Sequence, residues 1–303
     1  MRISTSNFYS TAIGKITDLQ GSLAKTQEQL STNRRLLTPS DDPVAASRAL
    51  EISQSQAVNT ALTTNRQNAR DSLNLASSTL GSVTLLLQHV KSEVVQAGNA
   101  GLADSDRSAI ATSLSSELDQ LVGLANTQDA TGQYLFSGYS TTTQPFTKTA
   151  TGATYSGDQG QRLLQVGQQR QIAVSDTGQN IFQSGTGAPE DVFKTMTDLI
   201  AALQVPGGAG LSDALATAND NIDAALDNVS MVNTAFGSSL QELDSLDSTG
   251  SDLDVQYQAS LSSLQDLNYA KAVSDLTQQQ ITLQAAQQSF VKISGLSLFN
   301  FLS

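Results

Sequence analysis

The chain has 303 residues, of which 39% are apolar, 5% aromatic and 15% charged, and its formal net charge is −12. This acidic balance argues against nucleic-acid binding, which needs clustered Lys and Arg side chains. The absence of cysteine excludes disulfides, thiol catalysis and thiolate metal sites. No apolar run reaches the ~18 residues of a membrane-spanning helix, so we expect no membrane partner. By its sequence signals the chain is either cytosolic or exported without a cleaved signal.

The N-terminal segment has apolar residues that alternate by three and four, the heptad spacing of coiled-coil helices. Polar Thr26 interrupts this series, which runs through Tyr9, Ala12, Ile16, Leu19, Leu23 and Leu30.

A helix boundary follows this segment. Pro39 biases the residue before it away from the helical conformation. Asp42 is a good N-cap for a second helix, and Pro43 fits its first turn. We interpret the adjacent Asp41 and Asp42 as part of this cap, not as catalytic carboxylates.

Two longer heptad series predict two further coiled-coil helices. The first is Leu62, Arg66, Ala69, Leu73, Ala76, Leu80, Val83, Leu87, Val90 and Val94. The second is Leu215, Ala218, Ile222, Ala225, Val229, Val232, Phe236, Ser239, Leu243 and Leu246. We expect the turn residues Ser248, Thr249 and Gly250 to separate this helix from the C-terminal one.

The segment between these helices, from Tyr134 to about Gly187, is rich in Gly and Thr and has short alternating runs. Turn signals separate the runs, which predicts a small β segment inserted between helices. The two helical arms must therefore return to each other to bury their apolar stripes. The N- and C-terminal segments are predicted to be neighbours in space.

The last predicted helix carries Tyr269, Leu276, Leu283 and Phe290 at seven-residue steps, with Gln279 interrupting the pattern. Its end, with Leu298 and Phe299, is apolar for the end of a chain. Two interpretations stay open. The helix docks on its own domain, or it presents a surface to another subunit, because an apolar end needs a partner.

Titratable groups give no catalytic constellation. The single histidine, His89, falls one residue off the Leu87–Val90 stripe, and we expect a surface or boundary position. A lone histidine is not expected to form a metal cluster. The acidic run Asp244, Asp247, Asp252 and Asp254 lacks the spacing of a calcium loop and is interpreted as solvated helix ends. No catalytic, cofactor or metal site is predicted.

Short blocks near the chain ends and in the middle carry a family resemblance. They are residues 1–5, 30–35, 39–46, 124–138, 155–158, 270–276, 283–287 and 292–299. These blocks resemble the bacterial flagellar hook–filament junction proteins (hook-associated protein 3), members of the flagellin-like superfamily. Flagellins are similar but typically have Ala-rich sequence where Pro43 stands. The chain ends Asn300-Phe301-Leu302-Ser303, where relatives often finish on an aromatic residue and Leu.

The resemblance implies a non-enzymatic structural adapter without cofactors. Such proteins leave the cell unfolded through the flagellar export apparatus with a cytosolic export chaperone. In the extracellular flagellum they form a homo-oligomeric ring between hook-associated protein 1 and flagellin. Two alternatives are weighed: a flagellin, the filament subunit itself, or a secreted coiled-coil adhesin or effector.

The expected fold is mainly α with a small β insert, a nested antiparallel coiled-coil hairpin whose N- and C-terminal helices pair. We predict a terminal assembly domain (1–40 with 260–303), a helical bundle (41–133 with 188–259) and a surface-exposed β domain (134–187). The subunit-assembly interface is predicted at Ile16, Leu19, Leu23, Leu30, Tyr269, Leu276, Leu283, Phe290, Leu298 and Phe299, and the helix-boundary motif at Pro39, Asp41, Asp42 and Pro43.

Overall fold

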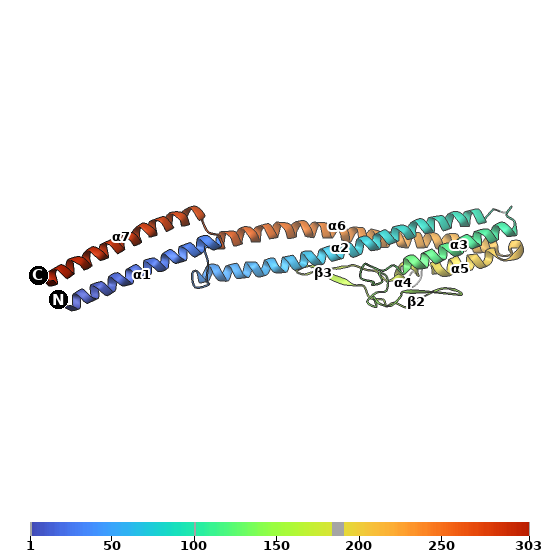
Figure 1. Ribbon diagram of the computed structural model, residues 1–303. Coiled ribbons are helices and arrows are strands. Elements are labelled where there is room, and N and C mark those ends of the chain that lie inside the picture. Colours follow the sequence, from blue (N-terminus) through green and yellow to red (C-terminus); the bar gives the residue numbers. More distant parts are fainter. Residues whose placement is uncertain (1, 100, 184–190, 303) are drawn as a thin grey trace. The chain divides into compact units, whose positions relative to one another are not determined.

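The computed structural model describes residues 2–99, 101–183 and 191–302, and most of them are helical (Figure 1). The helices are α1 (Arg2–Thr32), α2 (Pro43–Ala97), α3 (Asp104–Ala125), α4 (Gly178–Phe182), α5 (Val192–Leu203), α6 (Leu211–Gln265) and α7 (Tyr269–Leu302), with a short 3₁₀ helix, η1, at Pro206–Gly208. The strands are β1 (Phe146–Thr149), β2 (Gly152–Tyr155), β3 (Leu163–Gly167) and β4 (Arg170–Ala173). The predicted class, mainly α with a small β insert, is confirmed.

The chain forms two compact units, each described here by itself. The first comprises residues 1–59 and 252–303, and the second comprises residues 60–251. In the first unit, α1 and α7 lie antiparallel and side by side, as the heptad pattern predicts (Figure 1). The start of α2 and the end of α6 belong to this unit too, and Gln56 Nε2 donates to Asp254 Oδ1 over 3.0 Å.

The second unit has its core on the heptad stripe of α2, where every apolar member from Ala69 onward is buried. These are Ala69, Leu73, Ala76, Leu80, Val83, Leu87, Val90 and Val94. Six members of the α6 stripe are buried as well: Ala218, Ile222, Val229, Val232, Phe236 and Leu243. Ser77 of α2 lies 2.6 Å from Asn233 of α6, and Lys91 pairs with Asp223. These contacts fix the two helices as antiparallel.

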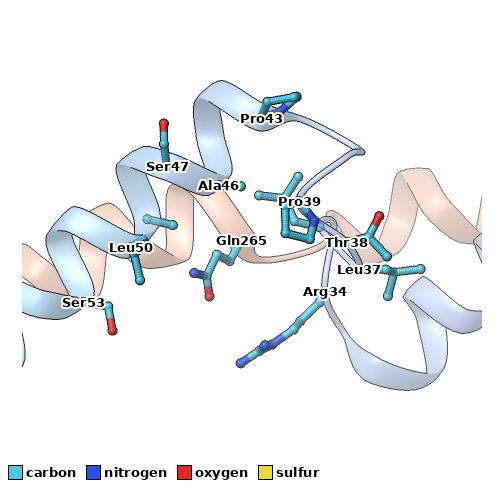
Figure 2. A pocket seen from close by; sticks show the side chains of 12 residues that line it. Arg34, Leu37, Thr38, Pro39, Pro43, Ala46, Ser47, Leu50, Ser53 and Gln265 are labelled. Atoms are coloured by element: carbon cyan, nitrogen blue, oxygen red, sulfur yellow. The ribbon is translucent and has the colours of Figure 1, made fainter.

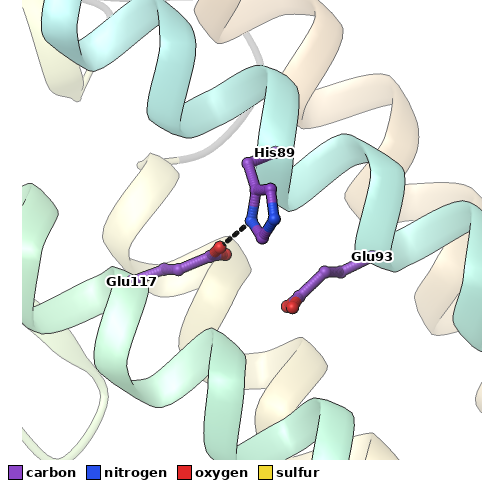
Figure 3. A group of neighbouring side chains, drawn as sticks. All are labelled: His89, Glu93 and Glu117. Carbon is purple, nitrogen blue, oxygen red and sulfur yellow. Dashed lines mark hydrogen bonds and ion pairs between the residues drawn. The ribbon is translucent and has the colours of Figure 1, made fainter.

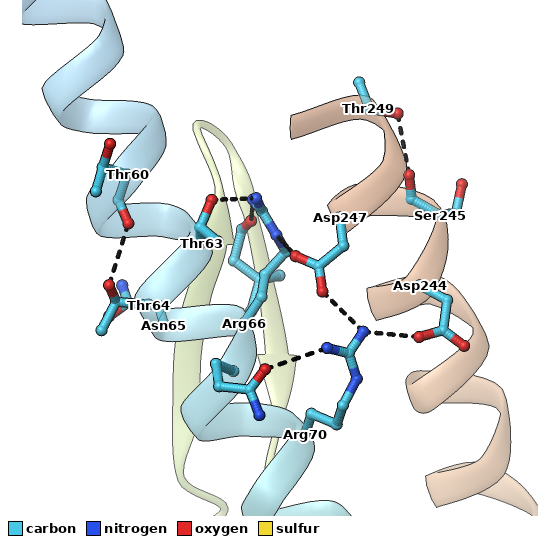
Figure 4. A network of polar contacts seen from close by, with 12 residues as sticks. Thr60, Thr63, Thr64, Asn65, Arg66, Arg70, Asp244, Ser245, Asp247 and Thr249 are labelled. Atoms are coloured by element: carbon cyan, nitrogen blue, oxygen red, sulfur yellow. Dashed lines mark hydrogen bonds and ion pairs between the residues drawn. The ribbon is translucent and has the colours of Figure 1, made fainter. Parts of the chain in front are cut away.

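One member of the α2 stripe is charged. Arg66 is 3% exposed, donates from Nη1 to the carbonyl oxygen of Val166 over 3.0 Å, and pairs with Asp247 (Figure 4). Arg70, one turn further on, lies 2.7 Å from carboxylate oxygens of both Asp244 and Asp247. The interpretation of this acidic run as helix ends is therefore wrong, because Asp244, Asp247, Asp252 and Asp254 all lie inside α6. Asp244 and Asp247 pair with two arginines of α2, although the Asp244 side chain stays 71% exposed.

The predicted β segment consists of two antiparallel hairpins, β1–β2 and β3–β4, and its last part, residues 184–187, lies outside the described residues. Asn126, at the end of α3, holds β1 through two bonds: its Nδ2 donates to the carbonyl oxygen of Phe146, and the Phe146 amide donates to its Oδ1, both over 2.9 Å. The ring of Phe146 contacts those of Phe182 and Phe193, with centroids 5.6 and 4.9 Å away. These aromatic contacts anchor β1 to α4 and α5.

The predicted break at Ser248-Thr249-Gly250 is wrong, because α6 continues to Gln265. Gly250 is buried, and the Thr249 hydroxyl donates to the carbonyl oxygen of Ser245 over 3.0 Å, as a helical threonine does. A glycine inside a helix costs only about 1 kcal/mol relative to alanine, which packing along a 55-residue helix overrides. The actual break falls between Gln265 and Tyr269.

No helix in the described part of the chain has the length and apolarity that crossing a membrane requires.

Candidate assembly interface

The seam between α1 and α7 brings together the predicted interface residues whose side chains are described, apart from Tyr269. Seven of them are half-buried: Ile16, Leu19, Leu23, Leu30, Leu276, Leu283 and Phe290. Only Thr26 and Ala272 of this helix pair are fully buried among the described side chains. Two helices alone expose part of every heptad side chain, because a coiled-coil knob is enclosed only when partners surround it. The two helices pair through this seam, but they leave its side chains partly exposed to solvent.

An aromatic contact joins the beginning of α1 to the later part of α7. The rings of Tyr9 and Phe290 meet edge to face, with centroids 5.8 Å apart and planes at 85°. Beside this contact a cavity of about 220 Å³ opens among Ala12, Ile16 and Ala286. A well-packed core would leave no such space, so the side chains here do not fill the groove between the helices.

Polar residues interrupt the seam on both helices, as the sequence predicts. Thr26 is 8% exposed, and its hydroxyl donates to the carbonyl oxygen of Ser22 over 3.1 Å, so its own helix satisfies it. Gln279 has no such partner: its Oε1 is buried and accepts no hydrogen bond among the described residues. An unsatisfied buried polar atom costs about 1–3 kcal/mol, which weakens the pairing of the two helices.

A second set of apolar side chains faces outward from the pair. Ile13 is 53% exposed, Ile281 62%, Val291 66% and Tyr269 61%. Tyr269 is the first residue of α7 and lies outside the seam, unlike the seven half-buried residues named above. The side chains of Leu298 and Phe299 lie outside the described residues. The pair therefore has an apolar seam within it and apolar side chains on its surface.

The chain leaves α1 through a turn organised by Asp41. Asp41 Oδ2 accepts the backbone N–H groups of Leu37 and Thr38, over 3.0 and 3.1 Å, and Oδ1 lies 2.6 Å from Lys25 Nζ. The Lys25 ammonium, followed by the two backbone donors, lowers the pKa of Asp41 to about 2. The carboxylate therefore stays ionised and ties the turn back to α1.

Asp42 has the second role in the boundary motif. Its Oδ1 accepts the backbone N–H of Ala45 over 3.0 Å, which confirms the predicted N-cap of α2. That bond is also the main reason the pKa of Asp42 is lowered. Pro43 is the first residue of α2, where its missing N–H costs nothing. Asn33 begins the turn with a φ of 53°, a conformation that asparagine tolerates better than most residues.

The break between α6 and α7 lies beside this turn. Arg34 forms an antiparallel β-bridge with Asp266. The Arg35 backbone N–H donates to the carbonyl oxygen of Gln265 over 2.7 Å, and its Nη2 donates to that of Leu264 over 2.6 Å. Arg35 thus satisfies two carbonyl groups that the end of α6 leaves free. We call this region, residues 33–42 and 266–268, the joint.

A cavity of about 530 Å³ opens at the joint between the turn and the first turns of α2 (Figure 2). Leu37 and Pro39 line it from the turn, and Pro43 and Leu50 line it from α2, with Gln265 on the opposite side. Leu50 is 70% exposed. Two residues of the predicted boundary motif, Pro39 and Pro43, thus line an open, largely apolar hollow.

The comparisons with known proteins agree with this architecture. Residues 3–141 match the family model described as the bacterial flagellin N-terminal helical region. The flagellar hook-associated protein 3 of Escherichia coli strain K12 is 36% identical, over 99% of this chain and 99% of its own length. The chain belongs to the flagellar hook-associated protein 3 family. It is a structural adapter of the bacterial flagellum, and its partners are flagellar proteins.

Two further matches extend the comparison, one in fold and one in sequence. The flagellar junction protein FlgL from Legionella pneumophila shares the fold, with a TM-score of 0.60 at 21% identity over 72% of this chain and all of its own. A flagellin of Listeria monocytogenes is more distant in sequence, at 24% identity over 86% of this chain and 90% of its own length. The hook-associated relatives are structural flagellar proteins, in line with the prediction of a non-enzymatic role.

Sequence reasoning missed parts of this region. The outward apolar residues Ile13, Ile281 and Val291 fall off the heptad, so a search for coiled-coil positions passes over them. No pattern in the sequence singles out Arg35, although it connects the two breaks. The cap of α7 was also missed: Asn268 Oδ1 accepts the Lys271 N–H over 3.1 Å. An Asn before an amphipathic run was the available signal.

Proposed function

We propose that the chain forms the ring at the hook–filament junction, between hook-associated protein 1 and the first layer of flagellin. The observation that carries this proposal is the α1–α7 pair. Its heptad side chains are only half-buried, and Ile13, Ile281 and Val291 are mostly exposed. Fully burying a Leu or Ile side chain contributes roughly 1.5–3 kcal/mol. Neighbouring subunits that cover this surface therefore supply the free energy that the isolated pair lacks.

The three predicted domains follow from the same proposal. The terminal domain (1–40 with 260–303) contacts the neighbours, the bundle (41–133 with 188–259) supports it, and the β domain (134–187) faces the outside. Export proceeds through the flagellar apparatus, with a cytosolic chaperone covering the terminal helices beforehand. The absence of cysteine suits a chain that is exported unfolded. The role needs no enzymatic activity and no cofactor.

A substitution in the seam tests the interface. Leu283→Asp places a charge in the half-buried seam, where a carboxylate without a partner is costly. We expect the variant to be exported but to leave cells without attached filaments in electron micrographs. The matched control is Gln284→Asp, at the neighbouring exposed position, which should give normal filaments. Normal filaments with Leu283→Asp would contradict the proposed interface.

Deletion of the gene separates the adapter from the two alternatives. A junction adapter predicts loss of motility, with flagellin shed into the medium. A flagellin would instead be the dominant protein of sheared filaments, and its deletion would leave no such protein to shed. A secreted adhesin or effector predicts normal swimming after the deletion. The sequence similarity to a flagellin at 24% identity makes flagellin the stronger of these alternatives.

A further inference from the structure

Three side chains that bind metals in other proteins meet on the surface of the second unit. His89 and Glu93 stand one helical turn apart on α2, and Glu117 approaches them from α3 (Figure 3). One ligand atom from each of the three lies within 4.8 Å of the others. The sequence shows a lone histidine, and the fold brings two glutamates within reach of it.

One oxygen of each carboxylate is buried without a hydrogen-bond donor among the described residues. Glu117 is only 8% exposed, and its Oε1 pairs with His89 Nδ1, while its Oε2 is buried and has no hydrogen-bond partner among the described residues. Glu93 Oε2 is buried and without a partner in the same sense. Two unsatisfied buried oxygens of like charge are costly unless a cation binds them.

The protein itself supplies little positive charge here. His89 is the single cationic partner that Glu117 has in the described part of the chain, and its side chain is 65% exposed. Lys91, the nearest basic residue in sequence, is paired with Asp223 of α6. A protonated His89 balances at most one of the two carboxylates, and only the Oε1 atom of Glu117 receives its hydrogen bond. The remaining oxygens are free to bind an ion.

We propose that His89, Glu93 and Glu117 bind a divalent transition-metal ion, with zinc as the best fit. One imidazole nitrogen and two carboxylate oxygens are ligands that zinc accepts, and three protein ligands leave a fourth tetrahedral position for water. The imidazole disfavours magnesium and calcium, which prefer oxygen ligands. Zinc binds the neutral imidazole, so a protonated His89 releases its proton when the ion binds.

Small side-chain movements are enough to close the site. Zinc–nitrogen and zinc–oxygen bonds of about 2.0–2.2 Å bring tetrahedral ligand atoms to roughly 3.5 Å from one another. The ligand atoms start within 4.8 Å of one another, and the His89 side chain is 65% exposed, although it pairs with Glu117 before the ion binds. The exposed side of the cluster also gives the ion a path of entry. The bound ion would fasten α2 to α3, two helices that are otherwise joined by apolar packing at this level.

The test is a titration of the full-length chain, without an affinity tag and freed of metal by a chelator, with zinc alone. Isothermal titration calorimetry should give one zinc ion per chain. His89→Gln and Glu117→Gln should each weaken binding by about tenfold or more, at least as much as losing an outer-shell partner of a metal ligand. Cobalt, used as a spectroscopic probe, should give visible absorption typical of a tetrahedral site, and magnesium should not compete.

The matched control is Glu242→Gln, which removes a carboxylate bound by Arg170 in the same unit and should leave zinc binding unchanged. Because His89 is exposed, its variant should keep the helical circular dichroism of the parent chain, so a loss of binding reports on the site. The proposal is overturned if zinc does not bind at millimolar concentration. It is equally overturned if the His89 and Glu117 variants bind zinc as tightly as the parent chain, which would leave only a His–Glu ion pair.

Discussion

The ring of Tyr9 stands edge-on to the ring of Phe290, so the beginning of α1 is held against the later part of α7 by an aromatic pair. Such pairs contribute about 0.5–1.5 kcal/mol beyond the area they bury. A cavity remains beside this pair, next to Ala12 and Ala286. The contact is therefore a sensitive point for the pairing of the terminal helices.

Phe290→Ala should loosen this pairing. The variant loses the aromatic contact and part of the burial of a half-buried ring, and it enlarges the cavity next to Ile16. We expect faster hydrogen exchange at backbone amides of residues 280–295 in the purified chain. Val291→Ala, which shortens a side chain that is 66% exposed, should leave the exchange unchanged. Equal exchange in the two variants would mean that the aromatic pair does not hold the helices.

In the unaltered monomer, the terminal pair should exchange much faster than the second unit. Its heptad residues are half-buried and Gln279 Oε1 has no hydrogen-bond partner in the described part of the chain, whereas the α2 stripe from Leu73 to Val94 is fully buried. Local opening follows the number of buried apolar contacts. Hydrogen exchange measured by mass spectrometry should show weak protection in residues 10–30 and 270–295. Protection there as strong as in residues 73–94 would contradict an assembly-dependent pair.

Asp247→Asn should destabilise the second unit more than Asp244→Asn does. Asp247 neutralises Arg66, which is 3% exposed, and the substitution leaves a buried guanidinium without its charged partner. A hydrogen bond to a charged group is worth about 1.5–3 kcal/mol, so a loss of that order is expected in urea unfolding. The Asp244 side chain is 71% exposed, and its pair with Arg70 should contribute about 0–1 kcal/mol.

The two aspartate variants remove the same charge from the same helix, and both take a partner from Arg70. Only Asp247→Asn also removes the partner of Arg66, so the difference between the two losses reports on the Arg66 pair. Equal losses would show that this buried pair adds no stability.

The turn at Asp41 should lose stability in acid. The folded pKa of Asp41 is about 2, below its ordinary 3.8, so the ionised carboxylate stabilises the turn above pH 3.8. That stabilisation fades as the pH falls from 3.8 through about 2. The amide chemical shifts of Leu37 and Thr38, whose N–H groups donate to Asp41, should follow this midpoint in an NMR titration.

Lys25→Met removes the largest cause of this pKa shift and should move the midpoint upward, toward 3.8. Lys15→Met removes an equal charge from the exposed side of α1 and should leave the midpoint where it is. A midpoint near 3.8 in the parent chain would rule out the Lys25–Asp41 contact in solution.

Periodicity predicted most of the helical architecture. The α2 and α6 stripes are buried where the heptad places them, and the N-cap at Asp42 is where Pro43 and the following apolar run predict it. These features depend on spacing within one helix, which a sequence displays directly. The prediction of a helix break at Gly250 was wrong because the free-energy cost of one glycine is small compared with the packing of a long helix.

Features that depend on contacts between helices were harder to predict. Arg66 is a charged residue in an apolar stripe, and its partner Asp247 lies 181 residues away in the sequence. His89 looked solitary because Glu117 lies on another helix, 28 residues later. In both cases the residue types were visible, but only the folded chain brings the partners within reach.

The joint has a mechanical consequence. Both chain segments break at the same level, α1 before α2 and α6 before α7, and Arg34 and Arg35 connect the two breaks through Asp266, Gln265 and Leu264. A protein in a rotating appendage transmits torque through its backbone. Where two helices are interrupted together, that load passes through a few hydrogen bonds instead of continuous helical turns. Arg35 supplies two of those hydrogen bonds, one from its backbone N–H and one from its guanidinium group.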